Sequence, residues 1–200
     1  RWLGLSEVTI AQAESAHAIH PVTAIQSELS LWTRDPLGHG AEQGTGREQA
    51  EPTGRGSSDG TSDGASNNTS NGDLLAWTRD HGVSFVPFAP LGRGYLTGTL
   101  TPDGFEDGDF RATNPRFTPE AFARNQAITD EIARVASAHH ATSAQVCLAW
   151  LLGLSENIIP IPGTRSSTHL SQNLRATQLA LTDDEMRTLD GLPAPSGARY

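Results

Sequence analysis

The sequence contains no lysine, and all 14 of its basic residues are arginine. Acidic residues outnumber them, at 23, and the formal net charge is −9 at pH 7. Because a nucleic-acid surface needs clustered positive charge, this balance argues against a nucleic-acid partner. It leaves room for a single phosphate held in one local pocket.

Cysteine and long apolar runs are also scarce. The single cysteine, Cys147, excludes an internal disulfide framework and any multi-cysteine metal site. Its neighbours are apolar, so we interpret it as a small core residue rather than a reactive thiol. No apolar run approaches the ~18 residues of a membrane span, and the first residues show no signal-peptide pattern. We expect a cytoplasmic protein without a membrane partner.

Residues 38–72 contain almost nothing apolar and are dominated by glycine, serine, threonine, aspartate and asparagine. Such a composition cannot bury enough surface to offset the entropy of ordering it. We therefore predict a flexible insertion within one domain that spans residues 1–200. The histidines show no metal-ligand spacing with carboxylates, so we expect surface or loop histidines and no metal.

The rest of the chain alternates between strand and helix patterns. Strands are expected at 1–5, 22–28, 83–88 and 157–162. Helices are expected at 7–20, at 73–82, from 118, from 142, at 167–175 and from 182. This order predicts parallel strands with crossover helices. No G-x-G-x-x-G motif opens a doubly wound sheet, so we predict half of an eightfold β/α barrel, with ligands bound by the loops that follow the strands.

The loop after the last predicted strand combines glycine, a hydroxyl and a guanidinium, in Gly163, Thr164 and Arg165. Two interpretations fit this combination. One is a site for a phosphate-bearing ligand at the start of a helix, whose free backbone N–H groups favour anions. The other is an ordinary surface turn that happens to contain an arginine.

Several segments at these loops resemble the aldo-keto reductase family, in the order in which that family has them. They are GLSE at 4–7, AIQSELSLWTRDP at 24–36, PLGRGYLTG at 90–98, DFRATNPRF at 109–117, QVCLAWLL at 145–152 and PIPGTR at 160–165. The resemblance implies a (β/α)8 barrel, of the TIM-barrel type, that binds NADPH in an extended pose. It also implies that this chain is the C-terminal half of that barrel, strands five to eight with their helices.

The resemblance further implies reduction of a small aldehyde or ketone, with a tyrosine acid assisted by lysine, aspartate and histidine. All four belong to the N-terminal half of the family's barrel, so no catalytic residue is assigned here. Neither Tyr95 nor Tyr200 stands where the acid belongs.

For the nicotinamide end of NADP(H), the resemblance implies three residues. Ser6 and Gln26 match positions that hydrogen-bond the carboxamide, and Phe88 matches an aromatic residue that stacks against the ring. Taken alone, they read as a helix N-cap, a polar residue inside a barrel and a core phenylalanine. Glu7 stands where many relatives carry asparagine.

For the phosphates and adenine, the resemblance implies two further groups of residues. They are Pro90, Leu91, Gly92, Arg93 and Gly94 near the pyrophosphate, and Gly163, Thr164, Arg165, His169, Gln172 and Asn173 around the adenosine 2′-phosphate and adenine. Glycines in such loops let the backbone approach a phosphate closely. His169 stands where many relatives have arginine, and Gln172 where many have glutamate.

These features favour an NADP-dependent reductase whose missing half is supplied by a separate N-terminal half-barrel chain. Two alternatives stay open: a non-catalytic nucleotide-binding or subunit-associating module, and an inactive truncated remnant. A half-barrel would leave two open strand edges, which invite pairing with another chain.

Overall fold

The computed structural model describes residues 1–38, 73–102, 104–106 and 108–199. The insertion predicted at 38–72 therefore lies outside the described residues, apart from Gly38. On either side of it, Leu37 and Asp73 form an antiparallel bridge. The two described residues that flank this segment most closely in the bridge therefore lie side by side in the fold.

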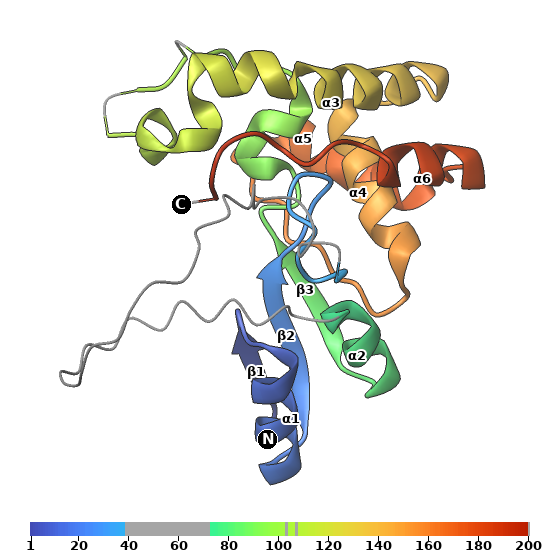
Figure 1. Ribbon diagram of the computed structural model, residues 1–200. Helices are drawn as coiled ribbons and strands as arrows, with labels where there is room; N and C mark the ends of the chain where they lie inside the picture. Colours follow the sequence, from blue (N-terminus) through green and yellow to red (C-terminus); the bar gives the residue numbers. More distant parts are fainter. Residues whose placement is uncertain (39–72, 103, 107, 200) are drawn as a thin grey trace, which may run out of the picture.

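A parallel sheet forms the centre of the structure (Figure 1). Its strands are β1 (Leu3–Ser6), β2 (Val22–Glu28) and β3 (Ser84–Phe88), in the order β1-β2-β3. Helix α1 (Ile10–Ile19) joins β1 to β2, and α2 (Leu74–Asp80) leads into β3. Parallel pairing confirms what the alternation of strands and helices predicted, and it places the carboxyl ends of all these strands along one edge.

The fourth predicted strand, 157–162, is not a regular strand. It runs beside β3 through one parallel bridge, Phe85 to Ile158, and through backbone hydrogen bonds from Ile159 to Phe85 (2.8 Å) and from Ile161 to Pro87 (3.2 Å). The intervening residues 160 and 162 are prolines, which have no N–H to donate to a ladder. The segment therefore pairs on its inner side alone.

Four further helices gather beyond the carboxyl ends of the strands (Figure 1). They are α3 (Pro119–Ala138), α4 (Ser143–Leu154), α5 (Ser167–Arg175) and α6 (Asp183–Asp190). Each of them starts at a capping hydroxyl, and Thr142 and Thr182 form capping boxes. None of the described helices is long and apolar enough to cross a membrane.

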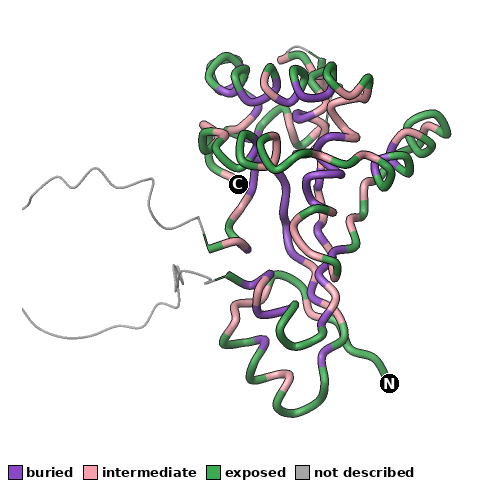
Figure 2. Tube along the Cα trace, turned by 90° about the vertical axis from the view of Figure 1, so that its right-hand side faces the viewer, coloured by how far each residue is buried: buried purple, intermediate pink, exposed green. Residues whose placement is uncertain are grey.

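The two faces of the sheet differ in burial (Figure 2). Side chains alternate along a strand, and Ile25 and Phe85 on one face are fully buried in the core. Gln26, Val86 and Phe88 on the other face are only half-buried. Cys147, on α4, is fully buried, as its apolar neighbours predicted. One face of the sheet is thus packed, and the other is incompletely covered.

Candidate functional site at the carboxyl ends of the strands

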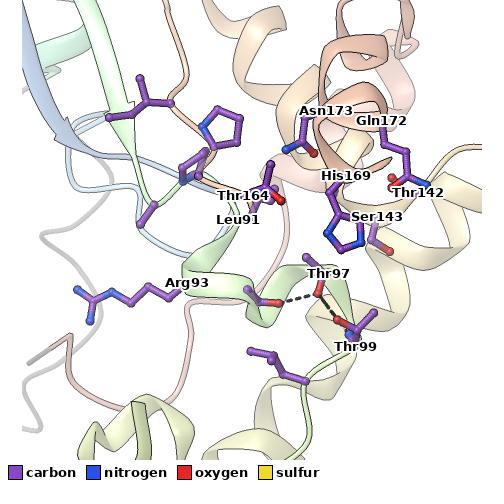
Figure 3. A pocket seen from close by; sticks show the side chains of 18 of the residues that line it. Leu91, Arg93, Thr97, Thr99, Thr142, Ser143, Thr164, His169, Gln172 and Asn173 are labelled. Carbon is purple, nitrogen blue, oxygen red and sulfur yellow. Dashed lines mark hydrogen bonds between the residues drawn. The ribbon is translucent and has the colours of Figure 1, made fainter. Parts of the chain in front are cut away.

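A cavity of about 570 Å³ lies between the loop after β3, the loop at 161–164 and the first turns of α4 and α5 (Figure 3). Most of the residues predicted to bind nucleotide line it. They are Pro90, Leu91, Arg93, Gly94, Gly163, Thr164, His169, Gln172 and Asn173. Two segments that are some 70 positions apart in the sequence therefore meet around one space, which is large enough for part of a dinucleotide.

Two of the predicted loop residues lie outside this cavity lining. Gly92 is buried, and a Cβ atom there would come within 2.6 Å of the Trp32 ring. Its lack of a side chain thus serves packing against Trp32. Arg165 is exposed, next to Thr164, which does line the cavity.

The three residues predicted for the nicotinamide lie on the half-covered face of the sheet. Ser6 pairs with Gln26 in the register of β1 and β2, and Phe88 pairs with Glu28 in that of β2 and β3. Because neighbouring residues of a parallel ladder point to the same face, Ser6, Gln26, Glu28 and Phe88 share one side of the sheet. The fold therefore groups them on one side of the sheet, and Phe88 directly precedes Ala89, which lines the cavity.

The backbone is unusual where the chain leaves these strands. Glu7, Ala89 and Arg93 have φ angles of 53°, 47° and 57°, in the left-handed region that favours glycine. Such a conformation costs a non-glycine residue on the order of 1–3 kcal/mol, and it clusters at binding sites. Two of these residues immediately follow β1 and β3, and the third lines the cavity.

Sequence reasoning missed several polar residues of the cavity wall. Thr97, Thr99, Arg111, Thr142 and Ser143 line it, and they add hydroxyls and a second guanidinium. In Figure 3, Thr142 and Ser143 are drawn next to His169 and Gln172 of α5, on the same side of the view. The sequence did point to two of these residues, because Thr97 and Arg111 fall within the segments PLGRGYLTG and DFRATNPRF.

The cavity wall carries two guanidinium groups, of Arg93 and Arg111, each paired with a carboxylate outside the lining. The amino ends of α4 and α5 both border it, and free N–H groups give a helix start a partial positive charge. Arg111 is held in place because its guanidinium pairs with Asp109 at 2.6 Å and donates to the Arg93 carbonyl at 3.1 Å. Hydrogen bonds from Arg111 lower the pKa of Asp109, so this carboxylate stays ionised. The arrangement can hold an anionic ligand.

A second group of charges, the strand-end cluster of Glu7, Glu28, Arg93 and Arg199, adjoins the cavity. The Arg199 guanidinium donates to Glu28 at 2.7 Å and to Glu7 at 2.8 Å, and Arg93 lies 3.6 Å from Glu28. The Glu28 side chain is only 2% exposed. Arg93 lines the cavity as well, so it joins the two regions. No sequence signal linked Arg199 to a residue 171 positions away.

Tyr95 does not belong to this site. Its side chain is buried, and its hydroxyl donates to the Phe122 carbonyl at 3.0 Å. Burial, reinforced by the charge of Asp130, raises the pKa of Tyr95 to about 12. An acid so weak and so enclosed cannot protonate a ligand in the cavity. Tyr200 lies outside the described residues.

Comparison with known proteins decides the family. A model described as "Aldo/keto reductase family" matches residues 66–193, more than half of the chain. The chain belongs to the aldo/keto reductase family. The resemblance drawn from the loop segments is thereby confirmed.

Curated aldo-keto reductases are similar over the whole chain. A probable aldo-keto reductase 1 from Glycine max is 31% identical over 203 residues, which cover 100% of this chain and 49% of that protein. Aldo-keto reductase yakc [NADP(+)] from Schizosaccharomyces pombe is 31% identical, over 100% of this chain and 51% of that protein. The chain thus spans about half the length of these relatives.

Solved structures agree at the level of the fold. The glycerol dehydrogenase of Gluconobacter oxydans superposes with a TM-score of 0.71 at 21% identity, over 96% of this chain and 48% of that one. An aldo-keto reductase from Klebsiella pneumoniae, in complex with NADPH, gives a TM-score of 0.56 at 20% identity, again over 96% and 48%. The open parallel sheet therefore matches half of these aldo-keto reductase folds.

Proposed function

We propose that this aldo/keto reductase chain is the NADP(H)-binding half of a carbonyl reductase with a (β/α)8 barrel. The observation that carries the proposal is the cavity, whose wall combines Arg93, Arg111, several hydroxyls and two helix amino ends. Guanidinium groups, hydroxyls and free backbone N–H groups are the donors that phosphates prefer. The S. pombe relative is named for NADP(+), and the K. pneumoniae structure contains NADPH.

The residues fit an extended dinucleotide. Thr164, His169, Gln172 and Asn173 would hold the adenosine end, and Arg93 with Arg111 the pyrophosphate. Ser6, Gln26 and Phe88 would orient the nicotinamide on the half-covered face of the sheet. Bound NADPH supplies a hydride for a carbonyl carbon of a small aldehyde or ketone.

We expect the proton donor for the resulting alkoxide to come from the N-terminal half, where the family resemblance places the tyrosine acid, since Tyr95 is buried. Exposed apolar side chains mark where a complementary half-barrel would pack. They lie along both sides of the sheet: Trp2, Leu3 and Ile19 beside β1, and Ile159, Ile161, Leu170 and Leu174 beside residues 157–162 and on α5. Trp2 is 80% exposed and Ile19 is 89% exposed, which is unusual for such large apolar groups.

An alternative function is a nucleotide-binding module without catalysis. The observation that favours it is the burial of Tyr95, which keeps this tyrosine from acting as the acid, whereas binding needs only the cavity and the strand ends. Co-expression with the N-terminal half of a relative separates the two functions. Restored NADPH oxidation supports the reductase, whereas tight nucleotide binding without turnover supports the module.

The first test is calorimetric titration of the 200-residue chain with NADPH, NADP+ and NADH. We expect binding of the phosphorylated nucleotides, and no aldehyde-dependent oxidation of NADPH by the chain alone. Replacing Arg111 with Gln should raise the dissociation constant of NADPH by about 10-fold or more, because a charge-assisted hydrogen bond is worth roughly 1.5–3 kcal/mol. Replacing the exposed Arg134 of α3, which pairs with Glu131, is the charge-matched control. Absence of any nucleotide binding would refute the proposal.

A further inference from the structure

Residues 195–199, which we call the strap, cross the carboxyl ends of the strands (Figure 1). The buried Asn125 of α3 fixes the strap by reciprocal hydrogen bonds with Ser196, at 3.1 and 2.7 Å. Asn114 donates to the Arg199 carbonyl at 3.0 Å. The backbone of Arg199 is thus held from one side while its side chain reaches the strand ends.

Gly197 makes this close docking possible. Its φ angle is 98°, and a Cβ atom there would lie 2.7 Å from the Pro115 carbonyl oxygen. Arg116 donates to the Gly197 carbonyl at 3.3 Å and to the Thr33 hydroxyl, which in turn donates to Glu28. The strap and the strand-end cluster therefore form one hydrogen-bonded unit.

The unit places a positive charge over Phe88. The Arg199 guanidinium carbon lies 5.9 Å from the centroid of the Phe88 ring. Around it, Glu7 and Glu28 supply two negative charges, and Arg93 supplies a second positive charge. The four side chains of the strand-end cluster sum to zero. Loss of Arg199 alone would make the charge at this end of the site more negative by one unit.

We propose that Arg199 sets the preference of the nicotinamide subsite between the oxidised and the reduced cofactor. This inference rests on the proposed function, which places the nicotinamide at Phe88. The nicotinamide of NADP+ carries a positive charge, and that of NADPH is neutral. By balancing Glu7 and Glu28, Arg199 keeps the subsite from retaining NADP+, the product of carbonyl reduction.

The size of the effect follows from Coulomb's law. If the Arg199 guanidinium and the nicotinamide ring are about 8–10 Å apart, in an effective dielectric constant of about 20, one unit of charge on Arg199 changes the affinity for the charged ring roughly 15- to 30-fold. Solvent at the half-covered face screens part of this interaction, so about 10-fold is the expected change.

The test compares the dissociation constants of NADP+ and NADPH, by calorimetry, for the wild-type chain and the Arg199→Gln variant. We expect Arg199→Gln to shift the ratio about 10-fold in favour of NADP+, and Glu7→Gln to shift it in the opposite direction. The double variant should return near the wild-type ratio. Arg79→Gln, in an exposed pair with Asp80 on α2, is the charge-matched control and should leave the ratio unchanged.

Each result has a defined meaning. Equal weakening of both nucleotides in Arg199→Gln, or an unchanged ratio, overturns the inference and makes Arg199 a purely structural tether. Binding of neither nucleotide by the wild-type chain overturns the proposed function, and this inference with it. Circular dichroism and thermal melting of each variant identify unfolding, and Arg199→Lys should keep the wild-type ratio if charge is what matters.

Discussion

Arg165 offers the sharpest test of how the adenosine end is recognised. Its side chain is exposed, but it directly follows Gly163 and Thr164, which line the cavity, and precedes the start of α5. An extended arginine at this point can reach a 2′-phosphate at the cavity rim. We therefore expect Arg165→Ala to weaken NADPH and to leave NADH nearly unchanged, because NADH lacks that phosphate.

The magnitude follows from the exposure of Arg165. A charge-assisted, bidentate contact is worth roughly 1.5–3 kcal/mol when it is shielded from water. For an exposed arginine the lower end applies, because solvent screens the ion pair. About 1.5 kcal/mol corresponds to about 10-fold in the dissociation constant of NADPH.

Calorimetric titration of NADPH and NADH measures this difference. Arg175→Ala, at the opposite end of α5 and also exposed, removes the same charge and should change neither constant. Equal losses for both nucleotides would mean that Arg165 supports the loop. An unchanged constant for NADPH would refute the contact and return Arg165 to an ordinary surface turn.

Three further predictions concern stability and reactivity. Replacing residues 39–72 with a short glycine-serine linker should leave the free energy of unfolding unchanged or raise it by up to about 2 kcal/mol, because each doubling of loop length costs about 0.6 kcal/mol. Urea denaturation measures this free energy, and a loss of several kcal/mol would show that the segment packs on the fold. Burial raises the pKa of Cys147 to about 12, so a thiol reagent at pH 8 should label the protein only after it unfolds; rapid labelling of the folded chain would contradict its burial. Burial of Glu7 opposes ionisation, but hydrogen bonds from Ser27 and the Glu28 N–H, with Arg199, outweigh it and lower the Glu7 pKa below 4.5. Its stabilising effect is therefore fully present above pH 4.5 and is lost as pH falls through the lower folded value. Glu7→Gln should thus lower the melting temperature at pH 7, and this difference should shrink steadily as the solution is acidified.

Local chemistry made the helices predictable. Thr118 followed by Pro119, and Thr142 with Gln145, mark helix starts because each satisfies N–H groups that the first turn leaves unpaired. The same reasoning located α6, whose start has a capping box of Thr182 and Glu185. The grouping of the glycine loop after β3 with residues 163–173 was also predictable, because loops that follow parallel strands meet at one edge.

Contacts between distant segments were not predictable from the sequence. Gly92 sits in a motif typical of phosphate loops, but its hydrogen faces Trp32, a contact that depends on how the loop folds back. Arg199 gains its partners only when the strap crosses the strand ends. The strand expected at 157–162 is irregular for a local reason. After the Phe85–Ile158 bridge, the next step of the ladder would need an N–H from residue 87 of β3, which is a proline.

Pro160 and Pro162 also make the two edges of the sheet differ in their capacity to pair with a strand of another chain. Along 158–162, the N–H groups of Ile159 and Ile161 are taken by β3, that of Ile158 is taken by Ser155, and residues 160 and 162 have none. The edge at 158–162 can accept hydrogen bonds from a strand of another chain but cannot donate any. Strand β1 contains no proline, and it lies beside the exposed Trp2. Misassembly during refolding should therefore be directional, growing from β1, and a proline or lysine placed at Leu3 should keep the chain dispersed.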